Sequence, residues 1–363
     1  MTLEQTISKT SPQVLIIGSD PTEQGGIGTV LSIYHQQGFM ENKRFLITHR
    51  EGTAVSRVFL FAKALCQFLW LLFTVPTLQV IHAHVSERGS FFRKSILVWL
   101  AKAAGKKNIL HNHGAEFLLF YDHCPFPVQW FIRKTLLSCD AVIVLSQQWA
   151  TDIRAIVPQA NIQVVYNPVV IPEAIKNSQT PSKSDDPVSF LFLGRVGKRK
   201  GAFDIVEAMS QLPDLPAKVH FYGDGALEEI NHMIQAKGLT SKIEVHGWIR
   251  GEQKQGVINA ADIMLLPSYN EGLPLTVLEA LANGMPVLST PVGGIPEAVE
   301  NGVNGYLVPP GDTTALAQQI STLTTEVQQR QTMGQKSLRR AQEKFDHRLI
   351  FNQLEALYQN LIG

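Results

Sequence analysis

Short apolar runs alternate along the first half of the chain with segments whose apolar residues recur at helical spacing. The first run spans residues 13–17 and ends at Gly18, before a polar turn and a helical pattern. The later runs also end at polar turns, and they are residues 79–83, 108–110, 141–145 and 163–166. Strands that alternate with helices in this way predict a parallel sheet covered by helices on both faces.

The alternation pauses at residues 171–187, which are polar and rich in proline and serine, as in a connection between domains. A second series follows, with apolar runs at residues 188–193, 218–222, 243–246, 263–266, 286–289 and 305–308, and the chain closes with a helical pattern over 315–361. We therefore expect an α/β protein of two doubly wound, Rossmann-like domains. Such domains bind ligands at the carboxyl ends of their strands, and two that face each other would form a cleft.

Composition narrows the class of protein. The chain has 363 residues, 45% of them hydrophobic, and a formal net charge of +1. Residues 1–170 hold 15 Lys/Arg and 10 Asp/Glu, a net charge of +5. The rest of the chain holds the remaining 17 Lys/Arg and 21 Asp/Glu, a net charge of −4. This weak basic bias is far below that of a nucleic-acid binder. Three cysteines without paired spacing (Cys66, Cys124 and Cys139) favour a reducing compartment, and a polar N-terminus predicts no export signal.

One segment, residues 55–75, is about as long as a membrane-spanning helix needs to be. Arg57, Lys63 and Gln67 interrupt it, so lying on a membrane fits better than crossing one. A helix in the core of an α/β domain explains the same pattern. The basic, apolar segment 91–107 leaves the same two interpretations open.

The most informative stretch is the loop and helix that begin at Glu271 and continue through Glu279. The unpaired amides around Leu275 and Thr276, at the start of the predicted helix, form an anion site that the helix dipole reinforces. Helical side chains lean toward the N-terminus, so Glu279 should tilt toward the pocket of Glu271. A phosphate site flanked by two acceptors for hydroxyl groups suits a nucleotide sugar.

Two loops at strand ends carry further candidates. Arg195, Lys198, Arg199 and Lys200 follow the first strand of the second series, where cations can neutralise a diphosphate; a solvated basic loop is the alternative. Gly25, Gly26 and Gly28 follow the first strand of the chain and open a helix. Such a loop lets the backbone approach phosphate, although a simple tight turn explains it equally well.

Histidines follow or lie within two other strands. His111 and His113 are two residues apart, but the sequence offers no third metal ligand at suitable spacing, so we expect no metal site. His113, beside Gly114, fits a hydrogen-bond donor to a sugar or phosphate. His82 fits a structural role best. His84 either has a structural role or lies near the molecule that would accept the sugar of a nucleotide sugar.

These motifs together resemble the retaining glycosyltransferases of family 4, which have the GT-B fold of two doubly wound Rossmann-like domains facing each other across a cleft. The resemblance covers nearly the whole chain and rests on Gly25-Gly26, His113-Gly114, Gly194-Arg195 with Lys200-Gly201, residues 222–225, and two glutamates eight positions apart, Glu271 and Glu279. It implies an N-terminal acceptor-binding domain over residues 1–170, a linker over 171–187 and a nucleotide-sugar-binding domain over 188–344. The C-terminal helix, about 345–363, would pack back onto the first domain.

The resemblance also implies roles for single residues in donor binding. Arg195 and Lys200 would hold the donor diphosphate, Glu279 would bind the ribose hydroxyls, and the amides of Leu275 and Thr276 would hold the distal phosphate. Lys198 and Arg199 stand between the two expected cations, which leaves open which side chains touch phosphate.

Other residues would act near the transferred sugar. Glu271 would contact the sugar near its reacting face, and His113 would contact one of its hydroxyls. Gly25, Gly26 and Gly272 would complete the donor-binding set. Catalysis would then depend on Glu271, His113, Arg195 and Lys200.

The implied activity is that of a retaining, metal-independent hexosyltransferase without a cofactor, which uses a nucleoside diphosphate sugar as co-substrate. The expected partners are this donor and a glycan or lipid-linked sugar acceptor, with peripheral membrane contact and no nucleic acid. We expect the protein in the cytoplasm, at the inner face of the membrane, in polysaccharide or glycolipid biosynthesis. The alternatives are a sugar-nucleotide epimerase of the same fold and a non-catalytic nucleotide-sugar-binding protein.

Overall fold

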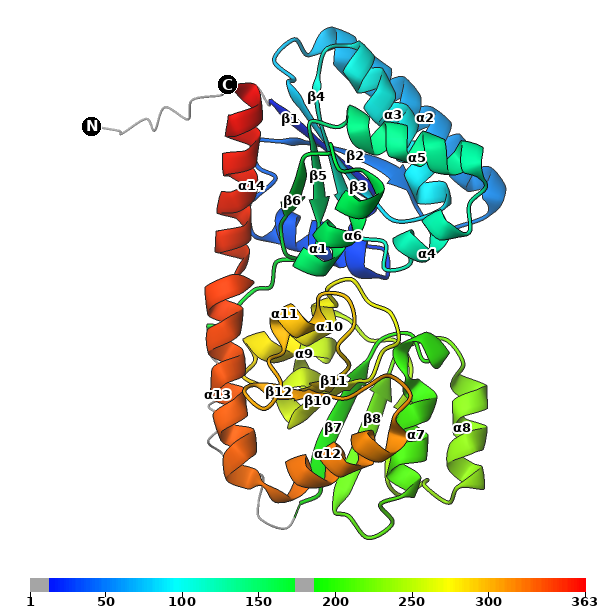
Figure 1. Cartoon of the computed structure of the whole chain (residues 1–363), viewed down its shortest axis with the longest axis vertical. Coiled ribbons are helices and arrows are strands. Elements are labelled where there is room, and N and C mark those ends of the chain that lie inside the picture. The colour runs from blue at the N-terminus through cyan, green and yellow to red at the C-terminus, as the bar shows by residue number, and fades with distance from the viewer. Residues whose placement is uncertain (1–12, 174–185) are drawn as a thin grey trace, which may run out of the picture. The chain divides into compact units, whose positions relative to one another are not determined.

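The computed structural model describes residues 13–173 and 186–363. The chain divides into two compact units, Met1–Val165 with Phe351–Gly363, and Tyr166–Ile350 (Figure 1). Most of the predicted linker 171–187 lies outside the described residues. The same holds for the N-terminal segment on which the expectation of no export signal depends.

The first unit is built on a six-stranded parallel sheet with the order β2-β1-β3-β4-β5-β6. Its strands are β1 (Val14–Ser19), β2 (Arg44–His49), β3 (Val80–Val85), β4 (Lys107–Asn112), β5 (Ala141–Val144) and β6 (Ile162–Val164). Every residue of β3 is buried, as expected of a strand that has helices on both faces of its sheet.

Seven helices complete the first unit in the described part of the chain. They are α1 (Gly26–Gln36), α2 (Ala54–Thr74), α3 (Gly89–Ala103), α4 (Phe117–Asp122), α5 (Phe126–Ser138), α6 (Gln147–Ile156) and, from Phe351 onward, α14 (His347–Ile362). The ring of Phe351 stacks on that of Phe39, with centroids 4.5 Å apart, and Tyr358 of α14 reaches His82 in β3. The last helix therefore adds aromatic side chains to the core of the first unit.

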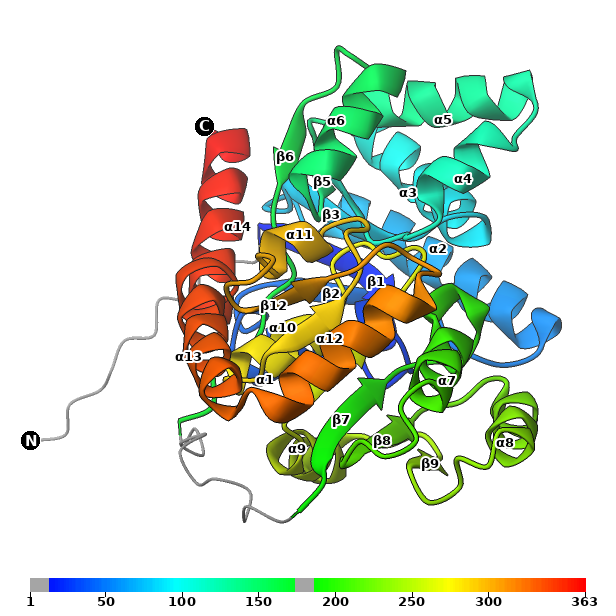
Figure 2. The ribbon, with the colours of Figure 1, turned by 60° about the horizontal axis from the view of Figure 1, so that its bottom comes forward.

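The second unit repeats the architecture with a parallel sheet in the order β12-β11-β10-β7-β8-β9. Figure 2 labels β7, β8, β9 and β12 of this sheet. Its strands are β7 (Val188–Leu193), β8 (Ala217–Tyr222), β9 (Ile243–His246), β10 (Ile263–Leu266), β11 (Val287–Ser289) and β12 (Gly305–Leu307). Its helices are the short 3₁₀ helix η1 (Lys198–Lys200), α7 (Ala202–Ser210), α8 (Leu227–Ala236), α9 (Gly251–Ala260), α10 (Leu275–Ala282), α11 (Ile295–Ala298), α12 (Thr313–Thr325) and α13 (Val327–Lys344).

The predicted α/β fold with two doubly wound parallel sheets is confirmed. The apolar runs mark eleven of the twelve strands and miss β2. This strand lies at the edge of its sheet, and only Leu46 and Thr48 are buried in it. Its apolar run, residues 45–47, is only three residues long and lies between Arg44 and Thr48, and it was overlooked.

The segment 55–75 forms α2, and its interpretation as a core helix is wrong for most of its length. Only Ala64, Phe68 and Leu71 are buried, at a spacing that places them on one stripe of the helix against the sheet and α3. By length and composition, α2 is the one helix in the described part of the chain that is long and apolar enough to cross a membrane. Segment 91–107, in contrast, is a core helix, α3, with Phe91, Leu97, Val98 and Ala101 buried.

Candidate active site

The candidate site of the second unit lies where β7 and β10 end. These two strands are neighbours in the parallel sheet, so the loops that follow them meet at the same edge. The loop after β7 carries Arg195 and continues into η1 with Arg199 and Lys200. The loop after β10 carries Glu271 and leads into α10. The topology therefore brings together cations and a carboxylate that are 71 or more residues apart in the chain.

Glu271 is the centre of this contact and is only 6% exposed. Its Oε1 atom accepts a hydrogen bond from Lys200 Nζ at 2.7 Å and one from Ser268 Oγ at 3.1 Å. Arg199 Nη1 lies 3.7 Å from the same oxygen. A buried carboxylate needs partners of this kind, because its desolvation is costly when it is unpaired.

Glycines allow the loops to approach this closely. Gly201 has φ +67°, and a Cβ atom there would lie 2.0 Å from the carbonyl oxygen of Pro267. Gly293 has φ +56°, and its Cβ would lie 1.9 Å from the carbonyl oxygen of Glu271. Neither position tolerates a side chain without moving the backbone that holds Glu271. Gly272 belongs to the same packed loop, since its carbonyl accepts the amide of Gly294 at 2.5 Å.

The N-terminal half of α10 carries buried side-chain atoms that have no hydrogen-bond partner among the described residues. Pro274 is the N-cap and has no side chain to accept from the amides of Leu275 and Thr276. Among the described residues, Thr276 Oγ1 and Glu279 Oε2 are buried without a hydrogen-bond partner. The other oxygen of Glu279 is 2.6 Å from Lys254 Nζ. Helix amides without a side-chain cap, a hydroxyl and a carboxylate oxygen thus lie in the N-terminal half of one helix, which is a favourable place for a phosphate and a hydroxyl donor.

Arg195 is not part of the contact around Glu271. Its guanidinium is 72% exposed and its Nη1 lies 3.2 Å from Asp224 Oδ2, after β8. The sequence singled out Arg195 and Lys200 as the pair of cations, whereas the structure joins Arg199 and Lys200 to Glu271. Ser268 and Lys254 were missed altogether, because their partners are fixed by tertiary contacts rather than by a motif.

The glycine loop of the first unit is less crowded. Gly25 is the N-cap of α1 with φ +113°, and Gly26 is its first residue. Within the part of the chain that the structure describes, no atom lies within 4 Å of a Cβ built on either glycine. A side chain at Gly28, in contrast, would lie 2.5 Å from the carbonyl oxygen of Glu23. Packing therefore explains Gly28, while the space beside Gly25 and Gly26 leaves room for a ligand to approach the backbone.

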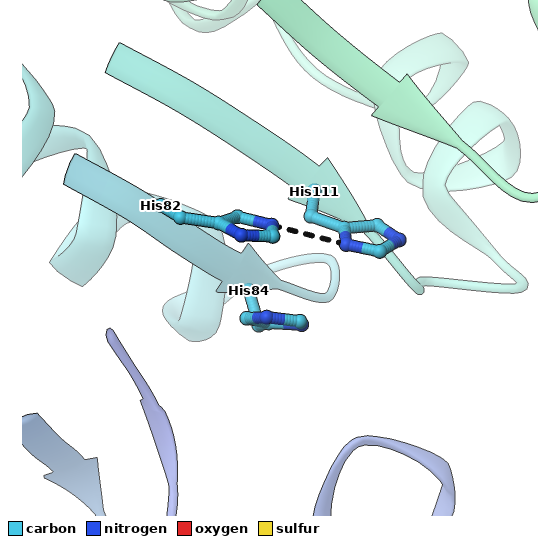
Figure 3. Close-up of side chains that lie close together, drawn as sticks. All are labelled: His82, His84 and His111. Atoms are coloured by element: carbon cyan, nitrogen blue, oxygen red, sulfur yellow. Dashed lines mark hydrogen bonds between the residues drawn. The ribbon is translucent and has the colours of Figure 1, made fainter. Parts of the chain in front are cut away.

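Four histidines form a cluster in the first unit. His82 and His84 lie in β3, His111 lies in β4, and His113 follows the end of β4. His84 and His111 are neighbours in the register of the two strands, so their side chains point to the same face of the sheet (Figure 3). His82 Nδ1 is 2.6 Å from the hydroxyl of Tyr358, and its Nε2 is 3.1 Å from His111 Nδ1. His84 Nδ1 is 2.9 Å from His113 Nε2. His82, His84 and His111 are fully buried, which supports the structural role predicted for His82.

The fold brings three histidines together that their spacing in the sequence did not reveal as a group. His82, His84 and His111 each offer a ring nitrogen, and these atoms lie within 4.8 Å of one another. Both nitrogens of His82 are already engaged, however, by Tyr358 and His111. A metal ion bound by all three would require His82 to give up one of these bonds, so the present geometry fits a hydrogen-bonded stack of rings better than a metal centre.

The hydrogen bonds also assign the tautomer of His113. His84 Nε2 is buried without a partner among the described residues, and a proton there would be an unpaired donor in the core. Buried donors without partners are rarer than buried acceptors without partners. His84 therefore carries its proton on Nδ1 and donates it to His113 Nε2. A neutral His113 then has its own proton on Nδ1, where the ring is a donor.

Burial of the cluster makes stability depend on pH. Desolvation lowers the pKa of His82 from 6.5 to about 3, and it lowers the pKa values of His84 and His111 well below 6.5. Below pH 6.5 the unfolded chain binds protons that the folded chain excludes, so the unfolding free energy should fall as the pH drops from 6.5 toward 3. Each histidine contributes up to about 1.4 kcal/mol per pH unit.

Urea unfolding at several pH values checks this expectation. His82→Gln should make the fall in unfolding free energy between pH 6.5 and about 5 less steep by one histidine's contribution. His123→Gln removes an exposed histidine and should leave the slope unchanged. Equal slopes for the wild-type chain and His82→Gln would show that His82 is not held neutral.

Comparison with known proteins matches part of the chain to a family of enzymes. Residues 173–340 match the family of group 1 glycosyl transferases. This range covers most of the second unit, including the contact around Glu271 and the first turn of α10. The chain is 29% identical over 239 residues to N-acetyl-alpha-D-glucosaminyl L-malate synthase from Bacillus anthracis, covering 64% of this chain and 62% of the relative. It is 27% identical over 173 residues to the capsular polysaccharide biosynthesis glycosyltransferase CapM from Staphylococcus aureus, covering 47% and 46%. The alignments thus span less than two thirds of these two relatives.

Solved structures share the fold over nearly the whole chain. Sucrose-phosphate synthase from Thermosynechococcus elongatus aligns with a TM-score of 0.79 and 21% identity, covering 97% of this chain and 99% of that one. HepE from Anabaena, solved in complex with UDP, aligns with a TM-score of 0.77 and 20% identity, covering 96% and 100%. The fold is therefore GT-B, and the comparisons together support a glycosyltransferase.

Proposed function

We propose that the chain transfers a sugar from a nucleoside diphosphate sugar to a hydroxyl of a glycan or lipid-linked acceptor. The observation that carries the proposal is the N-terminal half of α10, where no side chain caps the helix amides and where Thr276 Oγ1 and Glu279 Oε2 are buried without partners among the described residues. Phosphate oxygens accept hydrogen bonds from amides and from a threonine hydroxyl, and a sugar diol donates to a carboxylate. A sugar nucleotide has both kinds of group.

The reaction needs positive charge at the leaving diphosphate. Transfer passes through an oxocarbenium-like state in which negative charge builds on the departing phosphate. Lys200 and the N-terminus of α10 would stabilise this charge, and their fixed positions make the stabilisation effective. Because these groups supply positive charge themselves, we propose a metal-independent reaction without a cofactor.

Glu271 would hold Lys200 in place and contact the transferred sugar. The pair is buried, so it is held more rigidly than an exposed ion pair would be. We propose that the anomeric configuration is retained, with the leaving phosphate accepting the proton of the attacking hydroxyl. The roles of Arg195 at the diphosphate, of Gly25 and Gly26 near the phosphates, and of His113 at a sugar hydroxyl stay predictions.

The relatives indicate the class of donor and acceptor. HepE was solved with UDP and with UDP-glucose, and CapM is named for capsular polysaccharide biosynthesis. By analogy, we propose a uridine or related sugar nucleotide as the donor and a growing polysaccharide or glycolipid as the acceptor, in the cytoplasm.

A panel of sugar nucleotides tests the proposal. The thermal midpoint of the purified chain should rise by several degrees with at least one of them, since a ligand that binds only the folded state stabilises it. That donor should lose its sugar to an added glycan or lipid extract, with the anomeric configuration retained by NMR. Conversion of the donor without an acceptor would indicate an epimerase, and binding without turnover would indicate a non-catalytic protein.

A further inference from the structure

Three neighbouring helices of the first unit expose large aromatic side chains. Helix α3 lies between α2 and α5 and contacts both (Figure 1). Phe73 on α2 is 83% exposed, Trp70 is 60% exposed, and Phe126 on α5 is 70% exposed. Phe59 of α2, Trp99 of α3 and Trp130 of α5 are exposed as well. We call the outer surface of α2, α3 and α5 the aromatic face.

The exposure on α2 is the consequence of how the helix packs. Ala64, Phe68 and Leu71 form its buried stripe. At 100° per residue, Phe59 and Phe73 lie on the opposite side of the helix. The side of α2 that faces solvent therefore also carries large apolar side chains. Exposed apolar patches of this kind mark interaction sites in soluble proteins.

The charges of the aromatic face have one sign. Helices α2, α3 and α5 contain seven lysines and arginines and no aspartate or glutamate. Arg57, Lys63, Lys102 and Lys134 among them are exposed. Cations also lie over exposed rings, since Arg133 Cζ is 5.8 Å from the centroid of Phe126 and Lys134 Nζ is 5.9 Å from that of Trp130. Aromatic rings with basic side chains above them are typical of surfaces at a membrane–water interface.

The positive charge of the aromatic face favours an anionic lipid surface over a second copy of the chain as its partner. A second copy of the chain would bring the same cations to the contact, and like charges would oppose it. A bilayer with anionic headgroups offers negative charge at its surface and an apolar layer below, which suits both features of the face. Crossing the bilayer would pull the buried stripe of α2 away from the sheet, so α2 must lie along the membrane surface.

We propose that the aromatic face docks the first unit on an anionic lipid surface, with Phe59, Trp70 and Phe73 in the interfacial layer and the surrounding lysines and arginines on the headgroups. The proposal depends on the first unit alone and is independent of the donor chemistry of the second. It identifies a membrane-bound rather than a freely diffusing acceptor as the substrate that this surface would place near the protein.

Sedimentation with lipid vesicles tests the proposal. The full chain should sediment with vesicles of phosphatidylcholine containing about one third phosphatidylglycerol, and binding should weaken on raising the salt from about 0.05 M to about 0.5 M, because salt screens the charges. Vesicles of phosphatidylcholine alone should bind at least about tenfold less protein.

Variants assign the binding to the aromatic face. The double variant Trp70→Ser/Phe73→Ser should lower the apparent affinity at least about tenfold, and Lys63→Glu/Lys134→Glu should lower it similarly. Trp248→Ser and Lys336→Glu change exposed residues of the second unit and should bind as the wild type does. Far-UV circular dichroism and turnover of the donor with a water-soluble acceptor show that each variant is folded and that the donor site is intact.

Any one of three results would overturn the proposal. The first is a wild-type chain that stays in the supernatant with anionic vesicles, and the second is binding of the aromatic-face variants equal to that of the wild type. The third is a wild-type dimer in light scattering that Trp70→Ser/Phe73→Ser converts to a monomer, which would mean that a second copy of the chain covers the face. Loss of donor turnover in every variant, including the two controls, would concern the proposed function and not the membrane surface.

Discussion

Replacing Lys200 with alanine should lower the rate of sugar transfer by about 100- to 1,000-fold, the range found when one fixed charge-stabilising donor is removed from an active site. Lys200 Nζ is 2.7 Å from Glu271 Oε1 and is mostly buried, so water replaces its charge poorly. The loss should be in turnover more than in the Michaelis constant of the donor, because charge on the leaving phosphate is greatest in the transition state.

Lys198→Ala is the matched control for this variant. Lys198 is in the same 3₁₀ helix, η1, but is exposed, and its removal should change the rate less than about threefold. Lys200→Ala also leaves the Glu271 carboxylate with Ser268 and Arg199 as partners, so urea unfolding must accompany the kinetics. A folded Lys200→Ala chain with near-normal transfer would exclude Lys200 from catalysis.

Replacing Glu279 with alanine should weaken binding of the sugar nucleotide by about 10- to 100-fold, which corresponds to one or two hydrogen bonds to a charged group. Glu279 Oε2 is buried and has no partner within the described residues, whereas Oε1 is held by Lys254. The free oxygen would accept hydroxyls of the donor, and alanine removes this acceptor. Calorimetric titration with the donor measures the change.

Two further variants separate binding from the effect of the ion pair. Glu252→Ala removes an exposed carboxylate of α9 and should leave donor affinity unchanged. Lys254→Ala breaks the pair but keeps Glu279, so its affinity should fall less than that of Glu279→Ala. Equal affinities for Glu279→Ala and the wild type would show that the donor does not reach this carboxylate.

The fold could be predicted from the sequence because buried parallel strands are continuous apolar runs. Val188–Leu193 was predicted with its correct bounds, since β7 lies within its sheet and five of its six residues are buried. Strand β2, whose apolar run is only the three residues 45–47, was overlooked.

The candidate site was predictable only in part. The helix terminus at Leu275 and the carboxylates Glu271 and Glu279 follow from local sequence, because a loop, a proline and an apolar helix occur in order. The partner of Glu279 does not, since Lys254 is on a different helix and its distance depends on the packing of α9 against the sheet.

The histidine cluster shows the same limit. His82 and His84 are two residues apart in one strand, and His111 and His113 are two residues apart near the end of another. Only the pairing of β3 with β4 in this register places His84 beside His111. The sequence contains no signal for that register, so the third candidate ligand could not be found from it.

The central claim is that the second unit holds the diphosphate and sugar of a nucleotide donor between η1 and the first turn of α10. Hydrogen exchange followed by mass spectrometry, with and without the sugar nucleotide that stabilises the chain most, tests this directly. We predict slower exchange in peptides that cover residues 195–201 and 271–279. Unchanged exchange in both segments while the donor is bound would contradict the account.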